Sequence, residues 1–370
     1  MERTRDLFHN HELSSTRHTA NLLIKELATK HMTITAAEGI SGGSFLDTLT
    51  IPNSTKVFHL GIVAYSRRSK IEDLGVSQTT IDTYGEYSPE TALAMAFGIQ
   101  KFRQDTLAFG VTGNIDPTSQ IPIPYAHLVL AYQGETVLKT TINLRTSTRR
   151  ARKLELAQIM LSHALMFIQK HHHLENYTHQ INSNQHYLSV PKINLRLYTL
   201  VEYLKTHGLT VSTMESCTGG AIANAITDIP GASSIFDSAR VAYDEKAKQL
   251  LGDIPISAFA YGKVYSEQVA LLEAYAAQEK SGSDIAIGTT GTMENPDTRP
   301  FRTDTLEGTV YIAVVIKNKS PFVGKFNLPL STREYMKTQI VDIALEILYS
   351  KLGVNKFTLF KSNSPELLLR

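Results

Sequence analysis

The sequence contains the same series of motifs twice, and this repeat restricts the possible folds more than any other feature. Residues 35–43 match residues 212–220, so that Glu38 corresponds to Glu215 at a spacing of 177 residues (215 − 38). Further matches follow in the same order, and the spacing grows slowly, as loop insertions would produce. We therefore infer a duplicated domain. The further matches are Ile51-Pro52 with Ile229-Pro230, Val63-Ala64-Tyr65 with Val241-Ala242-Tyr243, Lys70 with Lys248, Thr112-Gly113 with Thr290-Gly291, and Asn143-Leu144 with Asn327-Leu328.

Length and composition agree with two domains. The chain has 370 residues, of which 42% are hydrophobic and 19% charged, so each half can bury a substantial core. We expect one domain over residues 1–170, a linker over 171–190, a second domain over 191–352 and a tail over 353–370. The linker contains His171-His172-His173 and further histidines without fixed spacing or accompanying acidic or thiolate ligands. We therefore expect a solvated linker and no metal site.

Charge and cysteine content exclude several classes of protein. The formal net charge is +2, which gives no electrostatic reason to expect nucleic acid or an anionic membrane as a partner. Cys217 is the one cysteine, so no disulfide framework can form within the chain. The polar N-terminus lacks an apolar secretory signal, and no stretch approaches the roughly 20 apolar residues of a membrane span. These features predict a cytoplasmic protein that does not enter membranes.

Helical and strand-like segments alternate in both halves. This alternation predicts a layered α/β domain with a largely internal sheet in each half. In the first half, we expect the opening helix near 21–30 and the last near 151–170. In the second half, the expected helices are 197–204, 221–226, 266–279 with Ser266 as N-cap, and a last one through 336–347; the expected strands are 209–214, 234–243, 284–288, 309–316 and 322–328.

The segment from Glu215 to Gly220 is the first candidate for chemistry. It lies between an expected strand and a helix start, where glycines allow backbone to approach a ligand and free N–H groups favour an anion. Ser216 is thus placed where a nucleophile would be useful. The simpler interpretation, a serine that caps the helix or bonds within the turn, remains open.

Tyr243 and Lys248 form a second candidate group. A lysine can take a proton from a serine hydroxyl only if desolvation or a nearby cation makes the neutral amine accessible, and a phenol or threonine hydroxyl can help to orient it. An exposed helix lysine is the alternative, and Lys246 is a nearby competitor.

Three other residues complete the candidates. Thr290, followed by Gly291, ends a buried strand, where ligands commonly bind. Arg333 precedes the last helix and could bind a phosphate by a bidentate contact or pair with a surface carboxylate. Cys217 has no histidine close in sequence, and we expect a small buried residue rather than the nucleophile.

Taken together, the motifs of the second half resemble the CinA C-terminal domain, the nicotinamide-mononucleotide deamidase family. The resemblance covers nearly all of residues 195–352 and is fainter in the first half. It rests on Glu215-Ser216-Cys217-Thr218-Gly219-Gly220, Ile226-Thr227-Asp228-Ile229-Pro230-Gly231, Val241-Ala242-Tyr243 with Ala247-Lys248, Tyr265-Ser266-Glu267, Thr290-Gly291 and Gly308-Thr309-Val310.

The resemblance implies hydrolysis of the carboxamide of nicotinamide mononucleotide to nicotinate mononucleotide and ammonia, with no cofactor or metal. In that reading Ser216 attacks the amide, Lys248 takes its proton, and Tyr243 and Thr290 position the site. It also implies an intramolecular pseudo-dimer and leaves further oligomers open. The implied substrate-binding positions are Glu215, Thr218, Gly219, Gly220, Gly291 and Arg333, with backbone N–H groups from Thr218 to Gly220 around the oxyanion or phosphate.

Two departures from the family pattern bear on function. Gly39 occupies the serine position of the first half, so we expect residues 32–170 to act as an inactive pseudo-subunit. In the second half, Thr292-Met293-Glu294-Asn295-Pro296 replaces a glycine-containing run. A catalytically inactive nucleotide-binding or scaffolding protein is therefore the alternative to an amidohydrolase.

Overall fold

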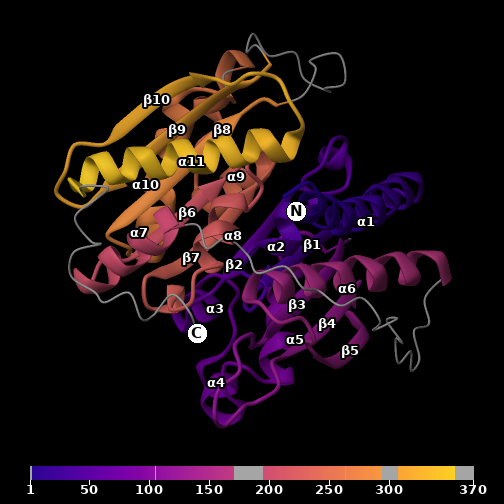
Figure 1. Ribbon diagram of the computed structural model, residues 1–370. Coiled ribbons are helices and arrows are strands. Elements are labelled where there is room, and N and C mark those ends of the chain that lie inside the picture. Colours follow the sequence, from indigo (N-terminus) through magenta and orange to yellow (C-terminus); the bar gives the residue numbers. More distant parts are fainter. Residues whose placement is uncertain (1, 105, 171–194, 263, 294–306, 355–370) are drawn as a thin grey trace.

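A single sheet of ten strands runs through the whole computed structural model, which describes residues 2–104, 106–170, 195–262, 264–293 and 307–354 (Figure 1). The strand order is β10-β9-β8-β6-β7-β2-β1-β3-β4-β5. Each half contributes five neighbouring strands, and the order in one half mirrors that in the other. The two copies therefore share one fold and form a pseudo-dimer within the chain, as predicted.

In the first copy, three parallel strands are followed by two antiparallel ones toward the outer edge. Its elements are α1 (Glu2–Thr29), β1 (Thr33–Glu38), α2 (Ser44–Leu49), β2 (Leu60–Ala64), α3 (Arg67–Glu72), α4 (Gln78–Tyr84), α5 (Pro89–Gln100), β3 (Thr106–Asn114), β4 (Tyr125–Tyr132), β5 (Glu135–Asn143) and α6 (Arg149–Lys170), with a short 3₁₀ turn at Ser54–Lys56.

The second copy repeats this order. Its elements are α7 (Leu195–Thr206), β6 (Val211–Glu215), α8 (Ala221–Thr227), β7 (Phe236–Ala242), α9 (Glu245–Gly252), α10 (Glu267–Ser281), β8 (Ile285–Gly291), β9 (Thr309–Ile316), β10 (Phe322–Asn327) and α11 (Arg333–Leu352), with 3₁₀ turns at Ala232–Ser234 and Ile256–Gly262.

The two copies meet where β2 pairs antiparallel with β7. In this register Leu60 lies opposite Ala242, and Ile62 lies opposite Arg240. Position 62 corresponds to position 240 in the repeat, so the pseudo-twofold axis passes through this pair. Hydrogen bonding across the seam makes the sheet continuous, and neither copy exposes an edge strand there.

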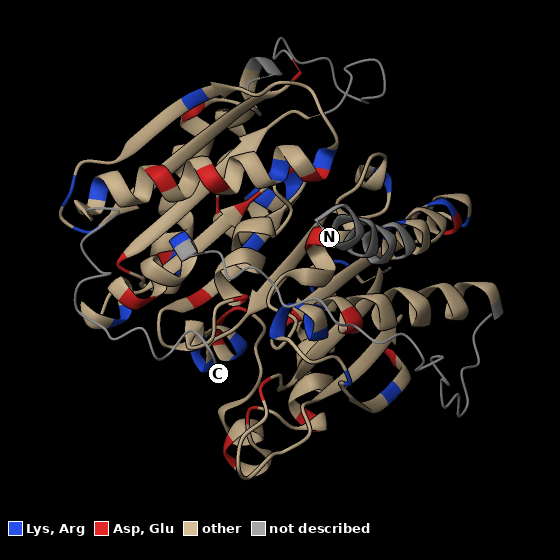
Figure 2. Ribbon diagram, in the orientation of Figure 1, with Lys and Arg blue, Asp and Glu red and all other residues tan. Residues whose placement is uncertain are grey.

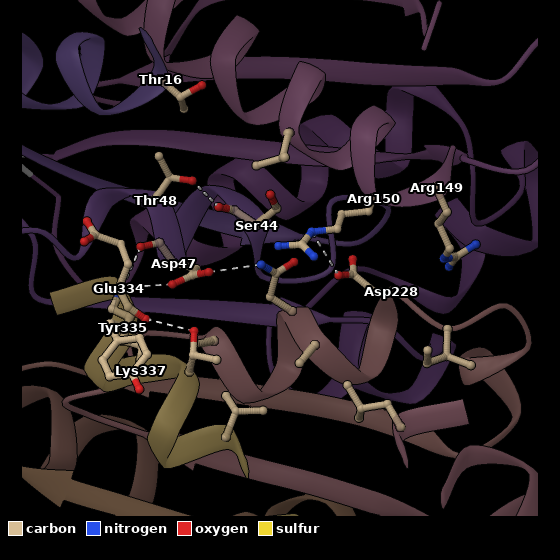
Figure 3. A pocket seen from close by; sticks show the side chains of 18 of the residues that line it. Thr16, Ser44, Asp47, Thr48, Arg149, Arg150, Asp228, Glu334, Tyr335 and Lys337 are labelled. Carbon is tan, nitrogen blue, oxygen red and sulfur yellow. Dashed lines mark hydrogen bonds and ion pairs between the residues drawn. The ribbon is translucent and has the colours of Figure 1, made fainter. Parts of the chain in front are cut away.

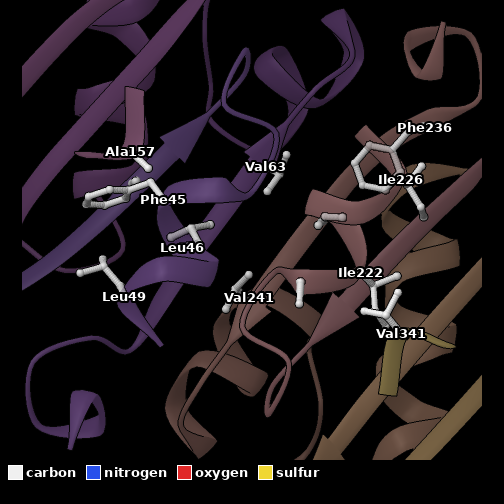
Figure 4. Packing of buried hydrophobic residues seen from close by; sticks show 14 of the residues in the cluster. Phe45, Leu46, Leu49, Val63, Ala157, Ile222, Ile226, Phe236, Val241 and Val341 are labelled. Atoms are coloured by element: carbon white, nitrogen blue, oxygen red, sulfur yellow. The ribbon is translucent and has the colours of Figure 1, made fainter. Parts of the chain in front are cut away.

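Helices cover both faces of the sheet. One face is packed by α1, α2, α6, α7, α8 and α11, and its apolar core extends without a break from one copy to the other (Figure 4). Leu46 of α2 illustrates the continuity, because its Cβ lies 3.5 Å from where a Cβ on Gly220 of the other copy would stand. The opposite face is packed by the remaining helices, α3, α4, α5, α9 and α10.

The observed elements follow the sequence-based expectations closely in the second copy. The strand expected at 309–316 is β9 with the same bounds, and Ser266 caps α10 by accepting a hydrogen bond from the Val269 N–H. The expectation for the opening helix was wrong in length, since α1 begins at Glu2 rather than near Asn21. The linker over 171–190 and most of the expected tail lie outside the described residues.

Charged residues of both signs are interspersed over the elements in view, and α11 carries both (Figure 2). Within the part of the chain that the structure describes, no helix combines the length and apolar character needed to cross a bilayer.

Candidate active site

The candidate residues of the second copy gather at one edge of the sheet. β7, β6 and β8 are neighbours and run parallel, so their carboxyl ends meet at the same edge. Ser216 follows β6, Tyr243 follows β7, and Thr290 lies near the end of β8. This is the edge where ligands bind in open α/β sheets.

Ser216 is almost fully buried, with 4% of its surface exposed. Its N–H donates to the carbonyl of Thr289 at 2.9 Å. Side chains alternate along β6: Ser212 bonds to Ala277 of α10, and Met214 packs on the same face. The alternation therefore directs Ser216 toward the α9/α10 face of the sheet.

The first copy gives an independent check on this direction. Gly39 corresponds to Ser216, and a Cβ placed on Gly39 would lie 3.5 Å from the Thr112 hydroxyl. Thr112 corresponds to Thr290, and both threonine hydroxyls donate to equivalent carbonyls, Thr112 to Glu86 at 2.9 Å and Thr290 to Val264 at 3.3 Å. The same geometry in the second copy places the Ser216 side chain beside Thr290.

Lys248 is a buried residue of α9, not an exposed helix lysine. Its Nζ forms an ion pair with Glu273 of α10 and lies 3.4 Å from the carbonyl of Ala242. The two side chains are 1% and 0% exposed. Burial raises the pKa of Glu273 to about 7, against the lowering effect of Lys248. Sequence reasoning missed Glu273, although an acid on the buried stripe of an alanine-rich helix was a signal for it.

Glu215 is bonded to the start of α8, and its predicted contact with substrate stays a prediction. Its two carboxylate oxygens accept hydrogen bonds from the N–H groups of Gly220, Ile222 and Ala223, and from the Thr213 hydroxyl. Burial raises its pKa, while these hydrogen bonds lower it. Glu215 thus fixes the start of α8, since it satisfies donors that the helix itself cannot.

The same loop contains the N–H groups predicted to surround the oxyanion or phosphate. The Gly219 N–H donates to the Ser216 carbonyl at 3.1 Å, and the Gly220 N–H donates to Glu215 at 3.1 Å. These two donors are engaged within the loop, and the oxyanion site from Thr218 to Gly220 stays a prediction. Gly219 has φ +62°, and a Cβ on it would lie 2.1 Å from the Thr50 hydroxyl of the first copy. Glycine is therefore needed for conformation and for contact between the copies.

Thr218 and Gly291 also serve the backbone arrangement. The Thr218 hydroxyl lies 2.8 Å from the Thr289 hydroxyl, which links the loop after β6 to β8. A Cβ on Gly291 would come within 2.6 Å of the Thr309 carbonyl, so only glycine allows β9 to approach this closely. The loop that follows continues beyond Met293 into residues 294–306, which lie outside the described residues.

Tyr243 and Arg333 form a pair that joins the two copies. Arg333 donates through one terminal nitrogen to the Tyr243 hydroxyl and through Nε to the carbonyl of Thr50 at 2.8 Å. The Tyr243 ring packs on Phe58 with centroids 5.6 Å apart, and its N–H donates to the carbonyl of His59 at 2.8 Å. The site of the second copy is thus built partly from the first.

Cys217 is a buried thiol, as expected. Burial raises its pKa to about 12, and the charges of Glu273, Arg333 and Lys248 also act on it. A thiol with this pKa carries almost no thiolate at neutral pH, so Cys217 is a poor nucleophile.

The first copy keeps several of the equivalent residues, with partners of its own. Arg149 pairs with Asp116 and also donates to the Tyr65 hydroxyl and the Thr227 carbonyl. Its lysine, Lys70, lies 3.4 Å from Glu86. The arginine that corresponds to Arg333 is thus paired with a carboxylate of its own copy.

A cavity of about 880 Å³ lies between the copies on the other side of the sheet, under α2, α8 and α11 (Figure 3). Ion pairs join its walls, among them Asp47 with Lys337 at 2.8 Å and Arg150 with Asp228 at 3.9 Å. Ser216, Tyr243 and Lys248 do not line it. We therefore place the candidate chemistry at the edge of the sheet and not in this cavity.

Comparison with known proteins agrees with the duplicated fold. The family model described as the CinA C-terminal domain matches residues 16–171 and again residues 196–352, which together make up most of the chain. The chain belongs to the CinA C-terminal domain family. Both CinA copies contain the sheet order and the loop after the first strand described above.

The relatives align with one part of this chain at a time. A CinA-like protein of Chloroherpeton thalassium is 50% identical over 91 residues, which are 24% of this chain and 21% of that protein. A relative from Acetivibrio thermocellus is 35% identical over 134 residues, 35% of this chain and 32% of that protein. The chain therefore spans about a third or less of these two relatives.

Two solved structures are among those that are similar to part of this chain. The competence/damage inducible protein CihA from Agrobacterium tumefaciens is 28% identical, with a TM-score of 0.40, and the match covers 43% of this chain and 94% of that one. The competence damage-inducible protein A from Klebsiella pneumoniae is 22% identical, with a TM-score of 0.41, and covers 44% of this chain and 99% of that one.

Proposed function

We propose that the second CinA copy is an amidohydrolase that converts nicotinamide mononucleotide to nicotinate mononucleotide and ammonia. The observation that supports the proposal is that Ser216 follows β6, Thr290 lies near the end of β8, and Nζ of the buried Lys248 lies 3.4 Å from the carbonyl of Ala242, the last residue of the neighbouring strand β7. A serine hydroxyl held away from bulk water at the same edge of the sheet as a buried amine suits nucleophilic attack on a carboxamide. Family membership and the resemblance of the motifs support the substrate class.

In the proposed reaction Ser216 attacks the amide carbon, and Lys248 accepts the hydroxyl proton. Lys248 then returns the proton to the leaving nitrogen, which departs as ammonia, and water hydrolyses the acyl-enzyme. Thr290 positions the serine. Arg333, held next to Tyr243 at the edge of the copy, is the proposed contact for the nucleotide phosphate.

Replacing the nucleophile is the direct test. We expect Ser216→Ala to reduce ammonia release from nicotinamide mononucleotide by at least about 1,000-fold, because the covalent step is lost. Ammonia release is measured by a coupled assay under substrate saturation. Cys217→Ala is the matched control, since its buried thiol has a pKa of about 12, and we expect most activity to remain. Turnover that survives Ser216→Ala would contradict the assigned nucleophile.

The alternative is nucleotide binding without catalysis. The engaged N–H groups of Gly219 and Gly220 and the ion pair on Lys248 favour this second candidate. Calorimetry separates the two functions: nicotinamide mononucleotide that binds the wild-type chain without ammonia release would support the alternative and remove the amidohydrolase.

A serine in the first copy tests whether only one copy is active. A Cβ on Gly39 would lie 3.0 Å from the Val111 carbonyl, so Gly39→Ser requires a shift of only a few tenths of an ångström. We expect the double variant Gly39→Ser/Ser216→Ala to remain inactive, because Asp116 neutralises Arg149. Ammonia release by this double variant, with Ser216→Ala alone as control, would show instead that the first copy lacks only its hydroxyl.

A further inference from the structure

The buried carboxylate of Glu273 has no function in the reaction proposed above. Its Oε1 pairs with Lys248, while its Oε2 has no hydrogen-bond partner. The side chain is 0% exposed. Burying a carboxylate with one oxygen unsatisfied is costly, so its presence beside the proposed base needs an explanation.

The repeat shows that the fold itself does not need this acid. Ser88 and Ser266 cap equivalent helices, so Glu273 of α10 corresponds to Met95 of α5, which is buried and apolar. The first copy instead supplies Glu86 to its lysine, from the loop before α5 and at 3.4 Å. The position that corresponds to Glu86 in the second copy is Val264.

The two copies thus provide their lysines with an acid from different positions. In the first copy Glu86 is 27% exposed, so water screens its charge from Lys70. In the second copy both partners are out of water, and the interaction is correspondingly stronger. The stronger interaction between lysine and carboxylate is thus found in the copy that carries Ser216.

We propose that Glu273 is a positioning residue that holds Lys248 as an ammonium ion, and that it thereby sets the pH above which Lys248 becomes available as a base for Ser216. This inference rests on the proposed function. Burial of a lysine favours the neutral amine, whereas an adjacent carboxylate favours the charged form. The Glu273 carboxylate, paired with Lys248 out of water, therefore opposes the effect of burial on the amine.

Other charged and titratable groups near α9 and α10 do not replace Glu273. The groups on the neighbouring elements are Cys217, whose thiol has a pKa of about 12; Glu215, held by the N–H groups of α8; Arg240 of β7, paired with Asp73; Tyr311 of β9, which interacts with Glu267; and the exposed Lys325 of β10. The groups on α9 itself are Glu245 and Lys246.

The test reads the protonation of Lys248 directly. The full chain is labelled with ¹³Cε-lysine, the Lys248 signal is assigned from Lys248→Arg, and its chemical shift is followed against pH. In Glu273→Gln we expect the titration midpoint of Lys248 to fall by at least one pH unit, because the counter-charge is gone while the burial remains. A midpoint that stays within about 0.3 pH unit of wild type would overturn the proposal.

The first copy supplies a matched control. Lys70 is as buried as Lys248 but pairs with Glu86 instead of Glu273. Its signal should therefore not move in Glu273→Gln, whereas Glu86→Gln should move the Lys70 signal and leave the Lys248 signal unchanged. If Glu273→Gln does not fold, Glu273→Met is used, since Met95 is accommodated at the equivalent position. Relocating the acid in Val264→Glu/Glu273→Met should return the Lys248 midpoint toward wild type; no return would contradict the role of the charge.

Activity provides the second readout. If the proposed function is correct, the acid limb of kcat/KM for nicotinamide mononucleotide should move to lower pH in Glu273→Gln, by the same interval as the Lys248 signal. A purely structural role would lower kcat/KM equally at every pH. A shifted Lys248 signal without any ammonia release from the wild-type chain would refute the proposed function and retain the role of Glu273 toward the amine.

Discussion

Lys248→Met should destabilise the chain by about 3–5 kcal/mol, because it leaves the Glu273 carboxylate buried without a counter-charge. The loss should appear as a lower free energy of unfolding in urea or guanidinium denaturation at alkaline pH. Lys248 lowers the pKa of Glu273, so in this variant the pKa lies above the value of about 7 that Glu273 has beside the amine. Stability should therefore be recovered as the pH falls through that raised pKa, since a protonated Glu273 no longer carries an uncompensated charge.

Replacing both partners should remove most of the penalty. In Lys248→Met/Glu273→Met, two apolar side chains of similar volume take the place of the ion pair, and Met95 already occupies one of these positions in the first copy. Such replacements are often neutral or stabilising, by up to about 4 kcal/mol. If the double variant is as unstable as Lys248→Met, the two side chains must stabilise the contact between α9 and α10 by interactions other than the compensation of their charges.

Asp73→Ala should have an effect of similar size at the seam between the copies. Asp73 ends α3 of the first copy and pairs with Arg240 of β7, with 7% and 3% of the side chains exposed. Burial lowers the pKa of Arg240, and Asp73 is the largest influence that opposes this. Removing it leaves a buried guanidinium unpaired, at a cost of about 3–5 kcal/mol.

The seam offers its own control for this prediction. Ile62 and Leu251 stand at the repeat positions that correspond to Arg240 and Asp73, so Asp73→Leu/Arg240→Ile makes both sides of the seam apolar. We expect this double variant to unfold close to the wild-type denaturant concentration and Asp73→Ala well below it. Equal stability of the two variants would show that the ion pair contributes little to the seam.

The duplicated α/β fold could be predicted from the sequence, because hydrophobic periodicity and the order of the motifs can be read along the chain without knowledge of the tertiary structure. The N-cap at Ser266 and the bounds of β9 follow from such local rules. The N-terminal end of α1 could not be predicted by these rules, since the hydrophobic pattern of α1 is weak and the ends of a helix depend on packing.

The candidate site was predictable only in part. Strand ends brought Ser216 and Thr290 together, as expected for parallel neighbours. The loop's own use of the Gly219 and Gly220 N–H groups could not be seen from residue types, because it depends on where the Glu215 carboxylate points. Glu273 was visible as an acid on the buried stripe of α10, but its partner Lys248 lies on another helix, and only tertiary packing brings the two together.

The residue at the pseudo-twofold axis has a consequence for how the duplicated gene can have evolved. In a true homodimer of the second copy, Arg240 would face a second Arg240, with Leu251 in place of the compensating Asp73. Two buried like charges would then meet at the centre of the joint. The two halves are therefore complementary rather than interchangeable. If they were separated into independent subunits, the second half could not form the same interface with a copy of itself.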